Sequence, residues 1–137
     1  KADTLLLLAD GKFHAINNAI QLNKEIYIFN TKSIEKITKQ DLQKAKQKTK
    51  AKQTKFLSYN NIGLITSTKP GQHYNIIGLK QKIQKLGKKV YTFEADNINI
   101  AELDNFPQIK IWVNTACPGL ALDDARIINL SDVKGFL

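Results

Sequence analysis

A strand–helix–strand pattern runs through the middle of this chain. It begins with Ile62-Gly-Leu-Ile-Thr66, an apolar run with the length of a strand. The polar segment Ser67-Thr-Lys-Pro-Gly71 follows, and its proline and glycine favour a loop. Apolar residues then recur with helical spacing from Tyr74 to Leu86, and Val90-Tyr-Thr-Phe93 has the composition of a second strand. This order predicts a parallel, right-handed unit.

The same alternation extends in both directions from this unit. Upstream, the apolar run Thr4–Ala9 predicts a strand buried on both faces, because it shows no polar alternation. The elements expected beyond it are a helix at 14–22, a strand at 25–29, a short helix at 98–103, and strands at 109–113 and 126–130. The sequence therefore predicts an α/β fold made of parallel sheet units with helices on both faces.

A lysine-rich segment separates the two sheet units. Residues 36–55 contain eight lysines and one acidic residue, Asp41, and their apolar stripe is narrow. With Thr31 or Ser33 as its N-cap, this segment predicts a solvated helix that connects the packed parts. The predicted organisation is residues 1–32 as the C-terminal part of an upstream α/β domain, 33–57 as the connecting helix and 58–137 as an α/β domain.

Length and composition limit the function classes. The 137 residues are 42% hydrophobic and 24% charged, which is a globular composition. The longest apolar run is too short to cross a bilayer, so no membrane association is expected. A single cysteine, Cys117, excludes an internal disulfide framework and fits a reducing compartment. The chain contains no Met and starts at Lys1, which indicates a piece of a longer protein.

The formal net charge of +9 is concentrated in the lysine-rich segment. A local basic stripe of this kind is also typical of a nucleotide- or RNA-binding module, which is the alternative interpretation. Only one arginine is present, however, and no aromatic residues alternate with these lysines. Both features argue against nucleic-acid recognition, in which planar guanidinium groups and stacking rings are favoured.

The loop after the strand at 62–66 is the first candidate site. Ligands of open α/β sheets bind beyond the carboxyl ends of the strands. This loop offers two hydroxyls, an ammonium, an amide and a flexible glycine for contacts with an anion or a cofactor, at Ser67, Thr68, Lys69, Gly71 and Gln72. It lacks the spacing of a Walker A loop, and the alternative interpretation is an ordinary polar turn.

Cys117 is the second candidate, because it follows the strand at 109–113 and precedes a proline. A free cysteine is more often a small buried apolar residue than a ligand or nucleophile, and both interpretations stay open from spacing alone. Neither His14 nor His73 is close to it in sequence, so no catalytic pair can be inferred. The acidic pair Asp123-Asp124 is better explained as a cap or turn than as a metal site.

Two motifs together resemble a known family. Thr66-Ser-Thr-Lys-Pro-Gly-Gln72 and Trp112-Val-Asn-Thr-Ala-Cys-Pro118, with Ala121-Leu-Asp-Asp124 after it, are similar to the last domain of the diphthamide synthesis proteins. The similarity is greatest to the archaeal-type 2-(3-amino-3-carboxypropyl)histidine synthase. The stretch Asp10-Gly-Lys-Phe-His14 resembles a Gly-x-Phe-His sequence late in that family's middle domain, so the resemblance covers nearly the whole chain.

This resemblance implies a specific chemistry. The family has three similar α/β domains, each of which gives one cysteine to a shared [4Fe-4S] cluster, and Cys117 matches the ligand of the last domain. The cluster binds S-adenosylmethionine and cleaves it to a 3-amino-3-carboxypropyl radical, which adds to a histidine of translation elongation factor 2. The implied protein is cytoplasmic and homodimeric at full length, and the fragment alone is expected to be inactive.

One departure and one alternative remain. Family members often carry arginine after the Cys-Pro pair, where this chain has Gly119. Some eukaryotic relatives support the radical step without performing it. A non-catalytic partner subunit of the same pathway is therefore the alternative implied by the resemblance.

Overall fold

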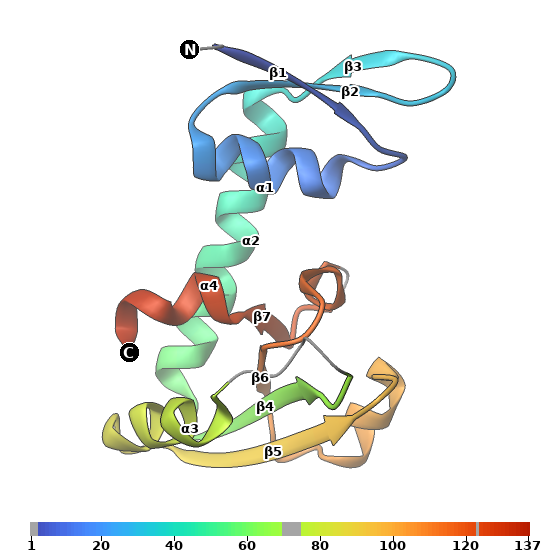
Figure 1. The fold of residues 1–137 in the computed structure, drawn as a ribbon. Coiled ribbons are helices and arrows are strands. Elements are labelled where there is room, and N and C mark those ends of the chain that lie inside the picture. The colour runs from blue at the N-terminus through green and yellow to red at the C-terminus, as the bar shows by residue number, and fades with distance from the viewer. Residues whose placement is uncertain (1–2, 70–74, 123) are drawn as a thin grey trace. The chain divides into compact units, whose positions relative to one another are not determined.

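The computed structural model describes residues 3–69, 75–122 and 124–137 (Figure 1). It confirms a mixed α/β fold with parallel strands and helices. The chain forms two compact units, residues 1–48 and 49–137, and the division falls within helix α2 (Lys39–Ser58). No helix in the described ranges is long and apolar enough to cross a membrane.

The first unit is a three-stranded sheet with the order β1-β2-β3. Strands β1 and β2 are parallel, and β3 pairs antiparallel with β2. Its elements are β1 (Thr4–Leu8), α1 (Lys12–Leu22), β2 (Glu25–Phe29) and β3 (Ile34–Lys36). One face of the sheet packs with α1 into a core that includes Ala15, Ala19, Ile26, Ile28 and Ile37.

The other face of this sheet is exposed, which corrects the expectation that β1 is buried on both faces. Leu6 and Leu8 are 60% and 74% exposed, and Phe29 and Ile34 share their face through the strand register. Leu5 and Leu7 point to the opposite face and pack on the core. The apolar run at 4–9 therefore contains a one-sided strand within the described residues.

Helix α2 begins later than the sequence indicated. Residues 34–36 form β3 instead of a first helical turn, so Thr31 and Ser33 are not its cap. The cap is a reciprocal pair: the Thr38 hydroxyl accepts from the Asp41 backbone N–H, and the Asp41 carboxylate accepts from the Thr38 N–H at 3.0 Å. These bonds hold the pKa of Asp41 below its usual value.

The C-terminal end of α2 is anchored in the second unit, although the segment was expected to be a solvated connector. Phe56 is fully buried and is the one buried residue of α2. Lys88 lies over its ring and donates to the carbonyls of Leu57 and Tyr59, both at 2.9 Å. A cation on these carbonyls complements the helix dipole, and burial lowers the pKa of Lys88.

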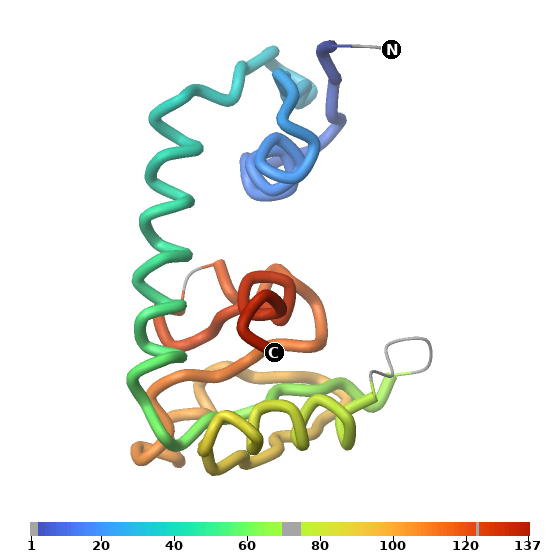
Figure 2. Tube along the Cα trace, turned by 90° about the vertical axis from the view of Figure 1, so that its left-hand side faces the viewer, coloured from blue at the N-terminus to red at the C-terminus, as the bar shows by residue number. Residues whose placement is uncertain are grey.

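The second unit is a four-stranded, fully parallel sheet with the order β5-β4-β6-β7. Its strands are β4 (Asn61–Ser67), β5 (Lys89–Ala95), β6 (Ile111–Asn114) and β7 (Ile127–Asn129). Helix α3 (Ile76–Lys85) lies along the sheet, as both views show (Figures 1 and 2). The predicted strand–helix–strand unit at 62–93 is confirmed.

Both faces of this sheet are covered. One core contains Phe56 of α2, Leu79 and Ile83 of α3, and Val133 of the short helix α4 (Leu130–Val133). The opposite core contains Trp112 and is covered by two 3-10 helices, η1 (Ile100–Asn105) and η2 (Pro118–Ala121). A last 3-10 turn, η3 (Lys134–Phe136), follows α4. The apolar runs of β4 and β6 are explained by this two-sided burial.

Candidate functional site

The candidate site is built on the carboxyl edge of the second sheet. Strands β4 and β6 are hydrogen-bonded neighbours in the middle of this sheet and run in the same direction. Just after β6, Thr115 donates its backbone N–H and its hydroxyl to the Ile65 carbonyl of β4, at 2.9 and 3.0 Å. The segments that follow the two strands therefore leave the sheet at the same edge, where ligands of such folds bind.

Cys117 lies in the segment after β6, three residues beyond its last residue, and is exposed. It directly precedes η2, whose first residue is Pro118. Its carbonyl accepts from the Leu120 N–H at 3.1 Å, which closes the first turn of η2. The structure thus presents the sulfur outside the apolar core, although its residue type is usually buried.

The side chain of Asn114, the last residue of β6, hydrogen-bonds the backbone of the segment that contains Cys117. The residue is 2% exposed, and both of its amide hydrogens are donated. Nδ2 donates to the Cys117 carbonyl at 2.8 Å and to Asn129 Oδ1 at 2.9 Å. Oδ1 accepts from the Ala116 N–H at 3.0 Å. A buried carboxamide with these partners carries no unpaired donor and fixes the path of residues 114–117.

Asn129 completes this arrangement from the neighbouring strand β7, where it is paired in register with Asn114. Its Nδ2 donates to the Pro118 carbonyl at 3.3 Å. Sequence reasoning did not identify either asparagine as a site residue. The available signal was that each one directly ends an apolar strand, at the sheet edge where the candidate ligands were expected.

The Ser67–Gln72 candidates are described in part. Ser67 is buried, and its hydroxyl accepts from the Lys69 N–H at 3.2 Å. The Thr68 hydroxyl hydrogen-bonds the Asp96 carboxylate, so it is already engaged. Lys69 is exposed. Gly71 and Gln72 lie outside the described residues.

The acidic residues beyond Cys117 form a turn where the structure describes them. Asp124 accepts from the Arg126 N–H at 2.7 Å and from its guanidinium, which also pairs with Asp104 of η1. The hydrogen bonds with Arg126 hold the pKa of Asp124 below its usual value. This is the turn that the sequence predicted for Asp124, while Asp123 lies outside the described residues.

The side chains available as metal ligands limit what the described part of the chain can bind by itself. Within residues 3–69, 75–122 and 124–137, no group of three His, Cys, Asp or Glu side chains is placed to hold a metal ion. Cys117 offers one exposed thiol on a hydrogen-bonded turn. One thiol at a sheet edge fits a ligand of a group shared with other protein segments, because iron–sulfur clusters take several thiolates.

These features define an α/β protein with one exposed cysteine just beyond the carboxyl edge of a parallel sheet. Residues 1–127 match the family described as "Putative diphthamide synthesis protein", and the chain belongs to this family. It is 26% identical over 130 residues to the 2-(3-amino-3-carboxypropyl)histidine synthase of Methanocaldococcus jannaschii, a match that covers 90% of this chain. It is 41% identical over 66 residues to subunit 2 of the corresponding synthase of Danio rerio, which covers 47% of this chain and 13% of the relative.

A solved crystal structure has the same fold. The crystal structure of Dph2 from Pyrococcus horikoshii with a 4Fe-4S cluster superimposes with a TM-score of 0.80 at 23% identity, over 98% of this chain. The chain spans 40% of that protein and 38% of the archaeal synthase. At this identity the structural likeness shows the shared fold alone.

Proposed function

We propose that this chain is part of an iron–sulfur enzyme that transfers the 3-amino-3-carboxypropyl group of S-adenosylmethionine to a histidine of translation elongation factor 2. One observation carries the proposal: a chain of the diphthamide synthesis family presents its single cysteine, exposed, at the carboxyl edge of a parallel sheet. The named activity of the archaeal and animal relatives supports the same reaction.

The residues of this chain fit one share of a [4Fe-4S] cluster, of which Cys117 is the ligand. When bound, the cluster supplies the electron that cleaves a carbon–sulfur bond of S-adenosylmethionine. The solved Dph2 structure with its cluster supports this assignment. In this chain, the Asn114 carboxamide and the Leu120 backbone N–H donate to the cysteine carbonyl, so that the thiol is the group left to bind.

The segment after β4 is the candidate for the polar end of S-adenosylmethionine. The Lys69 ammonium is exposed and carries the charge that complements a carboxylate. Ser67 and Thr68 shape the backbone around it through their own hydrogen bonds. Gly71 and Gln72 belong to the same loop in the sequence and are candidates for the same role.

The partners and the compartment follow from the same reaction. Elongation factor 2 is the protein substrate, and the full-length protein acts as a homodimer in the cytoplasm. A cysteine that must remain a free ligand is consistent with a compartment in which thiols stay reduced. No membrane or nucleic-acid partner is required.

The test uses the full-length protein that contains this chain. Reconstituted without oxygen, it should bind iron and sulfide, absorb visible light and modify the factor. Cys117→Ala should lose most of the cluster, and Lys69→Ala should keep the cluster but bind S-adenosylmethionine more weakly. Retention of the cluster and of full transfer activity in Cys117→Ala would overturn the proposal.

A non-catalytic partner subunit is the second candidate. It is favoured by similarity to relatives named both subunit 1, in Dictyostelium discoideum, and subunit 2, in Danio rerio. The two candidates differ in a single measurement. A catalytic protein modifies the factor alone, whereas a supporting subunit does so only when a second chain of the family is added.

A further inference from the structure

We propose that Asn114 and Asn129 are positioning residues that fix the backbone of Cys117 so that its thiol is oriented for iron ligation. The inference rests on the proposed function, because it assumes that Cys117 is a ligand. It assigns a role to two side chains that lie outside the candidate ligand set. The two carboxamides act through the carbonyls of Cys117 and Pro118.

The hydrogen bonds converge on the cysteine from two elements. The Cys117 carbonyl receives one donor from Asn114 of β6 and another from Leu120 of η2, at 2.8 and 3.1 Å. The next carbonyl, of Pro118, receives the Asn129 amide. Proline at position 118 further restricts the backbone of the residue before it.

These hydrogen bonds of Asn114 and Asn129, which we call the clamp, start from the last residues of two paired strands. Asn114 and Asn129 end neighbouring strands in the sheet, and their direct bond ties β6 to β7 at this edge. Asn114 is 2% exposed and fully paired, so its rotamer is determined by its surroundings. Ligands held in this way lose little freedom on binding, which is why outer hydrogen bonds tune metal affinity.

Two variants test the roles of the two asparagine side chains separately. Asn114→Asp keeps the acceptor for Ala116 but removes both donors. Asn129→Asp keeps the acceptor for Asn114 and removes only the donor to Pro118. Asn61→Asp makes the same chemical change at the first residue of β4, at the opposite end of the same sheet, and is the matched control.

The first readout needs no iron. In the iron-free full-length protein, Asn114→Asp should speed hydrogen exchange of the Leu120 amide about tenfold, because about 1.4 kcal/mol of local stability corresponds to that factor and to the loss of one or two hydrogen bonds. Asn129→Asp should give a smaller change and Asn61→Asp none. Equal exchange in Asn114→Asp and the native protein would overturn the clamp.

The second readout concerns the cluster. In Asn114→Asp, release of iron to a chelator should accelerate roughly 10- to 100-fold, the range for removal of an outer hydrogen bond. The electron paramagnetic resonance spectrum of the reduced protein should also change, which lower stability alone would not cause. Unchanged release and spectrum in a folded variant would overturn the inference.

These experiments distinguish a failure of the proposed function from a failure of the positioning role. A native full-length protein that never holds iron overturns the proposed function, whereas a loaded native protein with an unaffected Asn114→Asp variant overturns only the positioning role. If Asn114→Asp does not fold, Asn129→Ala decides, because it removes the acceptor of Asn114 and the donor to Pro118 without burying a charge.

Discussion

Gly63 shows how a single residue sets the packing of the second sheet. A Cβ added to Gly63 would overlap the Trp112 ring, which lies directly over this position on β4. Trp112 is 1% exposed and makes edge-to-face contacts with Phe93 and Phe106. The glycine is therefore required by the close approach of an aromatic ring to the strand.

Gly63→Ala is expected to destabilise the protein by about 1–3 kcal/mol, the usual cost of an overpacked core. Urea unfolding followed by Trp112 fluorescence measures the change. Gly135→Ala is the control, since nothing lies within 4 Å of a Cβ at Gly135. Equal stability of the two variants would show that the ring moves aside freely.

The Asp124–Arg126 pair makes the free energy of unfolding depend on pH in the acidic range. Hydrogen bonding to Arg126 lowers the pKa of Asp124, so the folded state binds this proton less tightly than the unfolded chain does. The stabilisation is complete above the ordinary value of 3.8 and is lost as the pH falls through the lowered pKa. Asp124 is only 15% exposed, which limits solvent screening.

Asp124→Asn should therefore cost about 1.5–3 kcal/mol at neutral pH, the range for hydrogen bonds to a charged group. The difference from the native protein should shrink as the pH falls below 3.8. Chemical unfolding at several pH values tests this. A cost that stays constant down to the lowest pH would assign it to packing instead of charge.

At the residue scale, the sequence predicted the place of Cys117 but not its supports. A cysteine just after an apolar strand of a parallel sheet must lie near the carboxyl edge, and it does. The roles of Asn114 and Asn129 depend on which strands are neighbours, because their bond joins residues 15 positions apart. Asparagine is equally common in turns without any such role.

At the scale of elements, the hydrophobic pattern predicted well the strands that are buried on both faces and the helices that have one apolar face. It predicted β1 as a strand but with the wrong burial, and it missed β3. A run of leucines looks the same whether one or two faces are covered, so the exposure of Leu6 and Leu8 could not be read from it. Strand β3 has three residues beside a lysine-rich helix, too few to show alternation. The cap at Thr38 and Asp41 was not predicted, because Thr31 and Ser33 come earlier in the sequence and are also residue types that cap helices.

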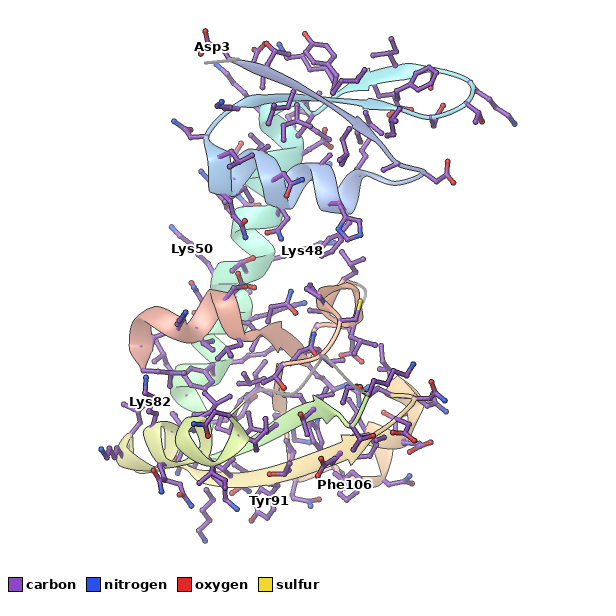
Figure 3. All side chains as sticks on the ribbon, in the orientation of Figure 1. Asp3, Lys48, Lys50, Lys82, Tyr91 and Phe106 are labelled. Atoms are coloured by element: carbon purple, nitrogen blue, oxygen red, sulfur yellow. The ribbon has the colours of Figure 1, made fainter. Side chains whose placement is uncertain are left out.

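Helix α2 should tolerate the loss of its exposed lysines. Lys44, Lys46, Lys48 and Lys50 are exposed, and Lys48 and Lys50 extend from the helix in Figure 3. Two i,i+4 pairs of like charge, 44 with 48 and 46 with 50, each cost roughly 0.2–0.5 kcal/mol. Replacing all four by Gln should leave thermal stability unchanged or slightly higher.

The matched variant adds Lys52→Gln to these four changes. Lys52 donates to the Ala121 carbonyl at 2.6 Å, so the fifth change should lower the melting temperature where the first four do not. Unfolding of the four-lysine variant would contradict the view that these side chains are solvated. Circular dichroism during heating distinguishes the two results.

The exposed sheet face of the first unit predicts association. Leu6, Leu8, Phe29 and Ile34 are all exposed and share one face of β1–β3, and neighbouring exposed apolar side chains favour association. The isolated 137-residue chain should therefore self-associate as its concentration rises, and Leu6→Gln with Leu8→Gln should reduce this. Leu22→Gln, at an exposed position of α1, is the control in sedimentation experiments.

At the scale of the whole molecule, the number of thiolates decides what this chain can do alone. It has one cysteine in 137 residues, and it spans 38% of the archaeal synthase that it resembles. A cluster that takes several cysteine ligands cannot be completed by one chain that has a single cysteine. A symmetric pair of such chains would supply two thiolates, still one fewer than the three that the family resemblance implies.

The isolated chain should accordingly stay colourless after anaerobic incubation with iron and sulfide, while the full-length protein turns brown. Iron analysis after desalting measures the difference, and Cys117→Ala in the isolated chain gives the background of nonspecific iron. Because the lysine-rich helix α2 repels cations and salt screens this repulsion, that background should be lowest at low salt. A stoichiometric, Cys117-dependent cluster in the isolated chain would mean that non-cysteine groups complete the site, and the shared-ligand arrangement would have to be abandoned.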